Sequence, residues 1–452
     1  MKFWLSRFAL AGVLIFSTGN AFLLGQVAEK EAKRSSGSWG QFRGPSGMGV
    51  VLSDQITTKL DPKEGYRWRT PLQGVGWSSP VTDGRVIWLT SAIASEATEE
   101  QKAAAVEKFQ MTKMKEIAGS LELLVQCLDL RTGELLLERK LADVDQPKPI
   151  HPMNSYASPT AAISGDRVIC HFGGYGTWCL DVQTGEELWN RRMVVDDSVG
   201  PGSSPVIVDD KVLLTCDGTD QQFIAALSMG TGEICWKTHR PKMRTTNGEF
   251  QKAYCTPLIV QIEGRQQAVI PGAQWCIAYD PTNGDEIWRF DHGGGFSVTP
   301  MAILADGKLV FSTGFTSPEL VCLDPTGRGD VTSTHVLWRT KRNAPTKPSL
   351  VSDHENLYVI SDDGILSSVS LETGETLWRK RIGGTFSASP IISGSKVFIG
   401  NHDGDMTIFK SGDEYAELGQ VAFGEQIMAS PMVVGNDIVI RTKAAVYRFD
   451  AD

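Results

Sequence analysis

Apolar and polar positions in this chain follow short runs that return many times. Runs such as Val168-Ile-Cys170 and Lys211-Val-Leu-Leu-Thr215 are short and rich in β-forming residues, which predicts strands. Many of these strands lead into a segment of the form Leu-Asp-x-x-Thr-Gly-Glu-x-x-Trp, in which a turn glycine precedes a second strand that carries a large aromatic residue. Copies begin at Leu128, Leu180, Leu227, Tyr279 and Ser370, and a stretched copy runs from Leu323 to Trp338. The chain is therefore predicted to be a repeat protein built of strands.

A second landmark is a small polar residue followed by proline and an apolar run. Its prolines are Pro80, Pro159, Pro205, Pro257, Pro300, Pro390 and Pro431, with Lys347-Pro348 as a degenerate copy. From Pro159 onward, successive landmarks lie 41 to 52 residues apart. This spacing matches the roughly 40–50 residues of a four-stranded propeller blade. Eight landmarks predict an all-β, eight-bladed β-propeller.

The two ends of the repeat region predict how the ring closes. The last blade starts at Ser430-Pro431 and leaves no room for an outer tryptophan-bearing strand before Asp452. The segment Tyr66–Leu72 resembles that missing strand. We expect this N-terminal strand to complete the C-terminal blade, because closure removes the free edges of an open sheet.

The chain divides into three predicted regions. Residues 1–25 have the features of a signal peptide: Lys2 and Arg7, an apolar run, and small residues up to Ala21. Residues 26–60 form a leader and a lead-in loop, and residues 61–452 form the propeller. We therefore expect an exported protein, periplasmic or extracellular, with no integral membrane span once the signal is removed.

Two segments depart from the repeat. The glycine-rich stretch Trp39–Gly49 is predicted to be a loop that packs its apolar side chains against the ring. Blade one contains an insertion between Thr90 and Leu121 that is predicted to form an amphipathic helix. The residues expected on the apolar face of this helix are Ala103, Val106, Met114 and Ile117. Packing on its own blade is favoured over a role as a lid or partner-binding element.

Composition narrows the class of partner. The chain has a formal net charge of −9 and a pI near 5.4, which argues against nucleic acid or an anionic membrane surface. Its 46 glycines fit a β protein dense in turns. A closed ring of this size is one cooperative unit, and we expect it to be monomeric.

The repeated Ser-Pro and Leu-Asp-x-x-Thr-Gly-Glu-x-x-Trp motifs resemble the PQQ-type β-propeller repeat. That repeat occurs in quinoprotein alcohol dehydrogenases and in the non-catalytic assembly factor BamB. The stretch Trp39-Gly-Gln-Phe-Arg-Gly-Pro-Ser-Gly47 resembles the lead-in of exported proteins of this type. The resemblance covers the mature chain, but its motifs describe turns and blade packing and do not define a site.

The sequence lacks the hallmarks that the resemblance implies for a quinoprotein dehydrogenase. Such an enzyme holds a quinone, a Ca²⁺ ion and an Asp base, and commonly carries two adjacent cysteines. This chain has eight cysteines, none adjacent, and no Cys-x-x-Cys-His haem motif. We expect no cofactor; PQQ with Ca²⁺ belongs to the alternative interpretation. No catalytic or metal-binding residue is predicted.

The cysteines have a structural interpretation. Cys127, Cys179 and Cys322 share one repeat position and are predicted to fill a small buried apolar slot. Cys170 and Cys179 flank one predicted hairpin, so a disulfide between them is a possibility in an exported protein.

One end of the ring is the candidate binding face. In a four-stranded blade, the segment leading into the inner strand and the loop between the second and third strands lie at the same end. An aromatic, loop-rich rim around a pore is the default site for a ligand or a partner. The rim residues predicted to bind are Trp77, Tyr156, His171, Tyr175, Tyr254, Phe296, Asp363, Phe386 and His402.

The function favoured by the sequence is an exported, non-catalytic propeller that scaffolds or binds protein partners at the cell envelope. The first alternative is a PQQ-dependent dehydrogenase with an atypical site. The second is a carbohydrate- or peptide-binding module.

Overall fold

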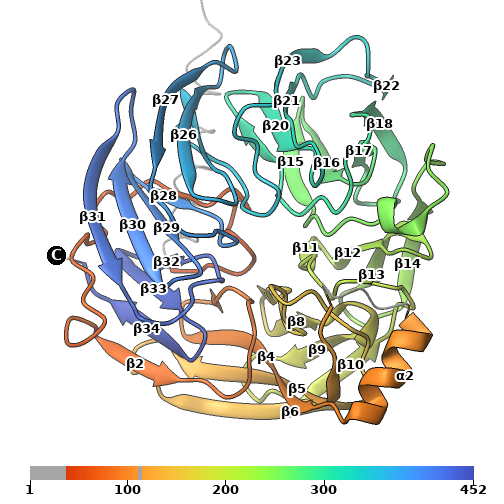
Figure 1. The fold of residues 1–452 in the computed structure, drawn as a ribbon, viewed down its shortest axis with the longest axis vertical. Helices are drawn as coiled ribbons and strands as arrows, with labels where there is room; N and C mark the ends of the chain where they lie inside the picture. Colours follow the sequence, from red (N-terminus) through yellow and green to blue (C-terminus); the bar gives the residue numbers. More distant parts are fainter. Residues whose placement is uncertain (1–36, 110–114, 452) are drawn as a thin grey trace, which may run out of the picture. The chain divides into compact units, whose positions relative to one another are not determined.

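Short strands joined by tight turns recur throughout the chain and assemble into eight sheets. The structure is a computed structural model that describes residues 37–109 and 115–451. Figure 1 shows the sheets arranged as blades around a common centre, which confirms the predicted eight-bladed propeller. The predicted signal peptide, residues 1–25, and the leader up to residue 36 lie outside the described residues.

The first four blades are formed by strands that follow one another in the chain. Blade one comprises β3 (Val81–Thr82), β4 (Val86–Glu96), β5 (Ala118–Asp129) and β6 (Leu135–Asp145). Blade two comprises β7 (Ala162–Ser164), β8 (Arg167–His171), β9 (Thr177–Asp181) and β10 (Glu187–Arg191). Blade three comprises β11 (Val206–Val208), β12 (Lys211–Asp217), β13 (Gln222–Ser228) and β14 (Ile234–His239). Blade four comprises β15 (Leu258–Ile262), β16 (Arg265–Pro271), β17 (Trp275–Tyr279) and β18 (Glu286–Asp291), with β22 (Gly329–Asp330) added at its edge.

The last four blades repeat this order until the chain ends. Blade five comprises β19 (Ile303–Ala305), β20 (Lys308–Ser312), β21 (Leu320–Leu323) and β23 (Val336–Thr340). Blade six comprises β24 (Val351–Ser352), β25 (Asn356–Ile360), β26 (Ile365–Ser370) and β27 (Thr376–Arg381). Blade seven comprises β28 (Ile391–Ser393), β29 (Lys396–Gly400), β30 (Asp405–Lys410) and β31 (Ala416–Ala422), with β1 (Val50–Val51) added beside β28. Blade eight comprises β32 (Met432–Val434), β33 (Asp437–Arg441), β34 (Ala445–Phe449) and the N-terminal β2 (Trp68–Pro71).

Strand β2 closes the ring, as the sequence predicts. It pairs antiparallel with β34, and Trp68 lies opposite Arg448. Backbone hydrogen bonds extend the pairing at both ends, from Arg67 N to Arg448 O and from Leu72 N to Ala444 O. The outer strand of the last blade therefore comes from the first part of the propeller region.

A chain of hydroxyl groups joins the inner strands of the blades. The backbone N–H at the start of one blade donates to a serine or threonine hydroxyl at the matching position of the next. The bonds run Ser79 to Thr160, Thr160 to Ser204, Ser204 to Thr256, Met301 to Ser349, Ser349 to Ser389, Ser389 to Ser430 and Ser430 to Ser79, at 2.9–3.1 Å. In blade five Met301 occupies this position and offers no hydroxyl, so blade four has no such bond to it.

The repeated turn docks on the tryptophan of the preceding blade. Trp236, for example, donates its indole N–H to Pro281 O at 3.0 Å, and its ring lies against Gly284. The same arrangement pairs Trp68 with Gly133, Trp189 with Gly232 and Trp338 with Gly374, while Leu137 replaces the tryptophan beside Gly185. These tryptophans therefore dock between neighbouring blades. The turn glycine is needed here because a neighbouring blade covers it.

Replacing Gly284 with alanine should destabilise the ring more than replacing Gly264, although both have φ of +77°. A Cβ atom at Gly284 would lie 2.5 Å from the Trp236 ring, whereas one at Gly264 would meet nothing within 4 Å. Backbone strain should cost each variant about 1–2 kcal/mol, and overlap should cost Gly284→Ala about 1–3 kcal/mol more. Urea unfolding of the two variants measures this difference, and equal losses would contradict the docking argument.

The lead-in segment Trp39–Gly49 crosses the end of the ring where the inner strands finish. Trp39 N donates to Thr82 O at 2.8 Å in blade one, and Ile163 N of blade two donates to Gly40 O at 2.6 Å. Phe42 and Met48 pack against the apolar cluster between blades four and five. The predicted packing of this loop against the ring is therefore confirmed, and the loop closes one end of the central pore.

Arg43 is the unexpected member of this loop, because its guanidinium is fully buried and no carboxylate among the described residues pairs with it. Its Nη2 donates to the carbonyl oxygens of Met48, at 2.9 Å, and of Leu350. Burial lowers the pKa of Arg43 to about 9. The side chain thus ties the lead-in to blade six through carbonyl groups.

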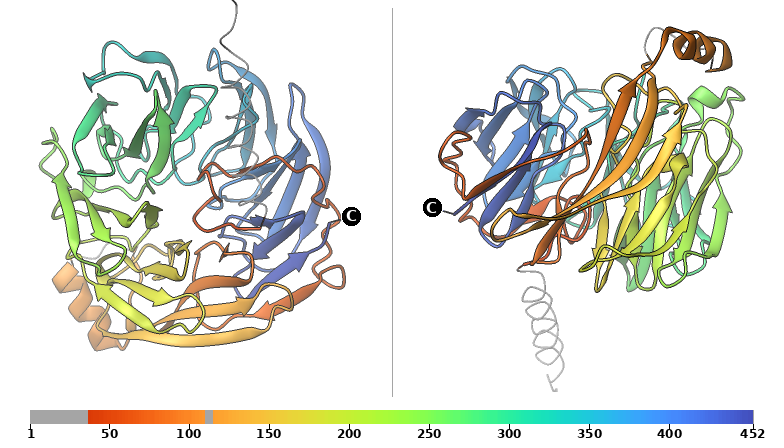
Figure 2. Two further views of the ribbon diagram at one scale, coloured as in Figure 1. Left: turned by 180° about the vertical axis from the view of Figure 1, so that it is seen from behind. Right: turned by 90° about the horizontal axis from the view of Figure 1, so that it is seen from below.

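The insertion in blade one forms a long hairpin that carries helix α2 (Glu99–Phe109). Figure 2 shows α2 standing off one end of the propeller. Thr98 and Gln101 cap its first turn reciprocally, Gln101 N donating to Thr98 Oγ1 and Thr98 N to Gln101 Oε1. The predicted apolar face was wrong, because Ala105 is the buried residue of α2 and Val106 is 55% exposed. Met114 lies outside the described residues.

The cysteines are all free, and seven of the eight are buried. The shared slot of Cys127, Cys179 and Cys322 is buried in each blade, as predicted. A disulfide between Cys170 and Cys179 does not form: Cys179 lies opposite Ile169 in the ladder and Cys170 opposite Trp178. In the described part of the chain no helix is long and apolar enough to cross a membrane.

Candidate functional site: a central cavity

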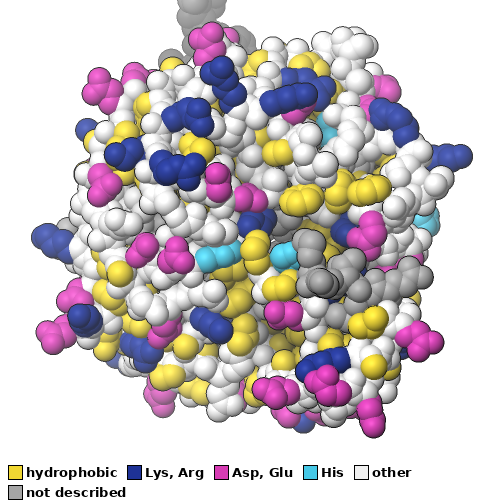
Figure 3. Space-filling view, viewed as in Figure 1, with side chains coloured by type: hydrophobic (Ala, Val, Ile, Leu, Met, Phe, Trp, Pro, Cys, Tyr) yellow, Lys and Arg dark blue, Asp and Glu magenta, His cyan; other side chains and the backbone are white. Residues whose placement is uncertain are grey.

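A cavity of about 700 Å³ occupies the centre of the propeller, on the face where α2 projects. Figure 3 looks onto this face and shows hydrophobic side chains around a central hollow. Phe42 of the lead-in lines the cavity, and so do the hydroxyl-bearing residues of the inner ring. These are Ser79, Thr160, Ser204, Thr256, Ser349, Ser389 and Ser430. Because the lead-in closes the opposite end, the cavity has its mouth beside α2.

One wall of the cavity is aromatic: Phe296 and Phe315 line it, and Phe250 extends it through its contact with Phe296. Phe250, Phe296 and Phe315 contact one another edge to face, with ring centroids 4.8 Å apart for the first two and 5.9 Å for the last two. Phe296 and Phe315 are held by an isolated β-bridge, in which Phe315 N donates to Phe296 O at 2.8 Å. Phe250 is 47% exposed and Phe315 53% exposed. The wall therefore presents apolar surface to solvent at the mouth.

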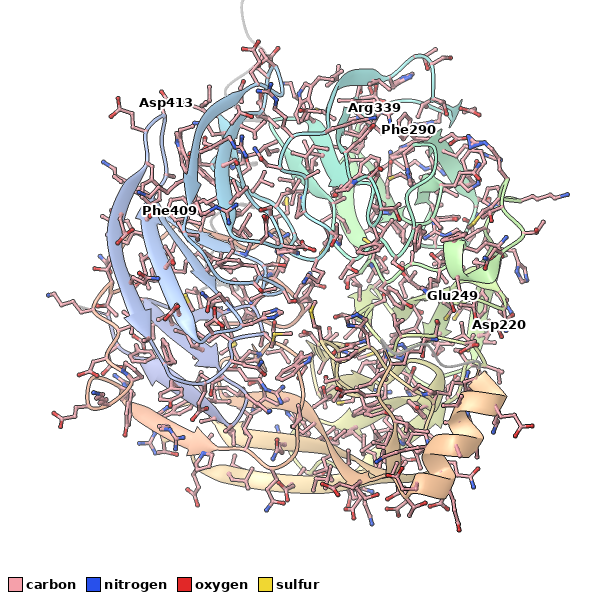
Figure 4. All side chains as sticks on the ribbon, in the orientation of Figure 1. Asp220, Glu249, Phe290, Arg339, Phe409 and Asp413 are labelled. Carbon is pink, nitrogen blue, oxygen red and sulfur yellow. The ribbon has the colours of Figure 1, made fainter. Side chains whose placement is uncertain are left out.

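A polar cluster lies beside this wall and is centred on Ser198. Ser198 Oγ donates to Glu249 Oε1 at 2.8 Å, and it lies 3.3 Å from Lys115 Nζ and 3.4 Å from Lys252 Nζ. Lys252 also forms an ion pair with Glu249. Figure 4 labels Glu249, which comes from the short 3₁₀ helix η2 (Gly248–Phe250).

The electrostatics of this cluster keep Glu249 ionised. Burial raises the pKa of Glu249, but hydrogen bonds from Lys252 and Ser198 outweigh it and leave the pKa below its usual value. Lys115 Nζ lies 4.0 Å from Glu249, beyond hydrogen-bond distance. One carboxylate therefore faces two ammonium groups.

A second polar group lies on blades six and seven. Asp362 Oδ1 accepts a hydrogen bond from Thr346 N at 3.0 Å, and Asp362 Oδ2 lies 3.8 Å from Lys347 Nζ. Burial lowers the pKa of Lys347. His402 Nε2 lies 2.8 Å from the Oγ of Ser387, a cavity-lining residue, and burial together with Lys347 lowers the His402 pKa to about 4. This imidazole is therefore neutral at pH 7.

The structure brings three of the nine predicted rim residues into the cavity wall: Trp77, Tyr254 and Phe296. His402 reaches the cavity through Ser387. Asp363 is exposed on the loop between β25 and β26, 3.7 Å from Arg381.

The other predicted rim residues, Tyr156, His171, Tyr175 and Phe386, contact other parts of the protein and do not line the cavity. Tyr156 and Phe386 are buried, and Tyr156 meets the half-buried Tyr175 edge to face at 6.2 Å. His171 is buried with its Nδ1 2.8 Å from Thr177 Oγ1, and burial lowers its pKa to about 4. Tyr175 Oη accepts a hydrogen bond from Lys148 N at 2.9 Å.

Sequence reasoning missed Ser198, Lys115, Lys252 and the two exposed phenylalanines. A signal for Phe315 existed, because it lies between the second and third strands of blade five, the loop type already assigned to the binding face. Phe250 and Lys252 lie between β14 and β15, a few residues before the Pro257 landmark, and they belong to no repeated motif. Lys115 comes from the insertion, which has no counterpart in other blades.

Comparison with known proteins matches the chain to one family model and to a curated protein of the same description. A family model described as outer membrane protein assembly factor BamB matches residues 74–238 and 272–452. The outer membrane protein assembly factor BamB of Legionella pneumophila (strain Paris) is 28% identical over 206 residues, which cover 45% of this chain and 49% of that protein. The chain thus matches about half the length of this curated relative.

Solved structures share the propeller fold at low sequence identity. BamB from Moraxella catarrhalis has a TM-score of 0.52 at 15% identity, covering 80% of this chain and 99% of the other. The quinohemoprotein alcohol dehydrogenase ADHIIG from Pseudomonas putida HK5 has a TM-score of 0.60 at 12% identity, covering 93% and 81%. At these identities the likeness shows the fold alone.

Proposed function

This chain belongs to the family described as outer membrane protein assembly factor BamB, and we propose that it is an exported, non-catalytic propeller that binds protein partners during outer-membrane protein assembly. The family match covers most of the propeller and leaves the partner unspecified. The role at the cell envelope is an inference from the family, combined with the predicted signal peptide in residues 1–25.

The observation that carries this proposal is a loop-lined central cavity whose wall includes a solvent-exposed phenylalanine. Phe315 lines the cavity and is 53% exposed, and the exposed Phe250 contacts Phe296 of the cavity wall. Val106 is exposed on α2, which projects on the same face. Soluble proteins that keep apolar groups in contact with water at a concave, loop-rich surface commonly use that surface for binding. This face therefore supports a binding role.

The chemistry of the cavity supports binding over catalysis. The carboxylates among its described lining residues are Glu249 and Asp362, and each is paired with a lysine. An ionised Glu249 whose pKa is held low is a weak general base. Two lysine-paired carboxylates from different blades also differ from the oxygen-rich cage that Ca²⁺ takes in a quinoprotein site.

In-cell photo-crosslinking tests the proposal. A photoreactive residue at Phe315 or Val106 is expected to form crosslinks to envelope proteins that act in outer-membrane protein assembly. The matched control is Leu52, which is 91% exposed and lies in the lead-in region, away from the cavity mouth. Equal crosslinking from Leu52, or no envelope partner from the cavity face, would contradict the proposal.

A separate assay on purified protein tests the alternative that the chain is a PQQ-dependent dehydrogenase. Purified protein supplied with PQQ and Ca²⁺ is expected to show no dye-linked oxidation of short alcohols or aldoses. Turnover in this assay would move the protein to the enzyme class.

A further inference from the structure

The central cavity is closed at one end, which limits what can enter it. Phe42 lines the cavity, and the lead-in that carries it is hydrogen-bonded to blade one through Trp39 and to blade two through Gly40. A ligand must enter and leave through the mouth beside α2. A polypeptide cannot thread through such a cavity. Its volume of about 700 Å³ lies within the range of about 300–1,000 Å³ typical of small-ligand pockets, which suits the end of a chain better than a folded loop.

The charge of the cavity differs in sign from the charge of the protein. Its described lining carries three lysines, Lys115, Lys252 and Lys347, against two carboxylates, Glu249 and Asp362. With neutral histidines, one positive charge is in excess, although the whole chain has a net charge of −9. The excess lies at the Ser198 cluster, where two lysines share one carboxylate. A partly enclosed cationic site attracts an anionic group more strongly than the open surface does.

The backbone at Ser198 is strained to hold this cluster. Ser198 is buried with φ of +57°, a left-handed conformation that is strained for a non-glycine residue. Its hydroxyl is the group that Lys115, Lys252 and Glu249 all contact. The aromatic wall adjoins the cluster directly, because Phe250 follows Glu249 in the chain and Ser297 N donates to Lys252 O at 2.8 Å.

From this juxtaposition we propose that the cavity captures the carboxyl-terminal end of a partner polypeptide. The terminal carboxylate binds at Lys115 and Lys252, and the apolar last side chain packs on the phenylalanine wall. The extra positive charge of the cavity favours a carboxylate over an N-terminal ammonium group. Because the cavity is closed at one end, it favours the end of a chain over an internal segment. This proposal rests on the proposed function and specifies what the cavity face recognises.

Titration of the purified protein with short peptides tests the proposal. The probe is the acetylated hexapeptide Ac-GSGSGF with a free carboxylate, and calorimetry is expected to show saturable binding that weakens with added salt. The C-terminal amide of the same peptide should bind about tenfold more weakly, or about 1.4 kcal/mol, because it lacks the charge. A peptide that ends in Ala should also bind more weakly, since it cannot cover the wall. Equal binding of acid and amide would overturn the proposal.

Substitutions locate the binding to the cavity. Lys115→Met should weaken binding of the free-acid peptide about tenfold and leave amide binding unchanged. Its control is Lys140→Met, on the outer strand β6. Phe315→Ala should weaken both peptides, and its control is Leu52→Ala. If either control variant loses peptide binding, the site is not in the cavity. The same conclusion follows if neither Lys115→Met nor Phe315→Ala weakens binding.

Two further ligands test whether the site requires the carboxylate of a chain end, or also accepts that of a glutamate side chain or of a free aromatic acid. An internal glutamate in Ac-GSFEGS-amide should bind weakly if a chain end is required, and equal affinity would overturn that requirement. Tight binding of phenylpropionate alone would make the site one for small aromatic acids and would also overturn the proposal. Failure of the peptides with intact crosslinking at Phe315 would reject this inference alone, whereas failure of both would reject the proposed function as well.

Discussion

Replacing Trp68 with alanine is expected to lower the free energy of unfolding by about 3–5 kcal/mol. Trp68 is buried, and its indole N–H donates to Leu130 O of blade one at 3.0 Å. A Cβ atom at Gly133 would lie 2.5 Å from the Trp68 ring, which shows how closely the two blades meet. The effect should be large because β2 joins the last blade to the first, so loosening it exposes the edge of β34.

Urea unfolding followed by far-ultraviolet circular dichroism measures this loss independently of tryptophan fluorescence. The control is Arg67→Ala in the same segment, which removes an exposed ion pair with Asp450 and should cost about 0–1 kcal/mol. If the two variants lose the same stability, closure through Trp68 is not what holds the ring.

Asp217→Ala should cost about 3–5 kcal/mol, because it leaves a buried guanidinium without its counter-ion. Arg240 contacts Asp217 through two nitrogens, with Nη2 to Oδ2 at 2.7 Å and Nε to Oδ1 at 3.2 Å, and both side chains are buried. Arg240 Nη1 also donates to Ile270 O at 2.9 Å in blade four. The pair therefore links blades three and four, next to the loop that carries the cavity lysine Lys252.

A double-mutant cycle separates the pair from the desolvation of its members. Asp217→Leu combined with Arg240→Met should recover most of the stability that Asp217→Leu loses by itself, since no buried charge remains. If the double variant loses as much free energy of unfolding as the two single variants together, the loss does not arise from leaving a buried charge unpaired. If Asp217→Ala alone lowers the free energy of unfolding by less than about 1 kcal/mol, water reaches the ion pair.

The repeat and its closure could be predicted because they depend on local chemistry that recurs. Most of the repeated turns place a glycine beside a tryptophan of the preceding blade, and each inner strand starts near a proline, so the eight proline landmarks mark eight blades. The N-terminal segment Tyr66–Leu72 could be recognised because it resembles the outer strand that the last blade lacks. Even the degenerate landmark Lys347-Pro348 has a place, since Ser349 after the proline supplies the ring hydroxyl.

The helix and the rim were less predictable from sequence. Helical periodicity marked the insertion but misplaced its buried face, because a helix that stands off the ring buries Ala105 alone and leaves Val106 in solvent. The expectation of a binding rim placed its candidates at the end of the propeller where the cavity has its mouth, and binding there stays a prediction. It could not separate Trp77, which lines the cavity, from Phe386, which is buried in the blade.

The sequence by itself determined the repeat, the number of blades and the strand that closes them, because these follow from patterns within each repeat. The tertiary structure alone decided which side chains share the cavity. Lys115, Ser198 and Lys252 come from three separate loops, and no spacing along the chain relates them. Their meeting depends on how adjacent blades are rotated around the ring, and on a lead-in loop that closes one end of the pore and leaves the other open.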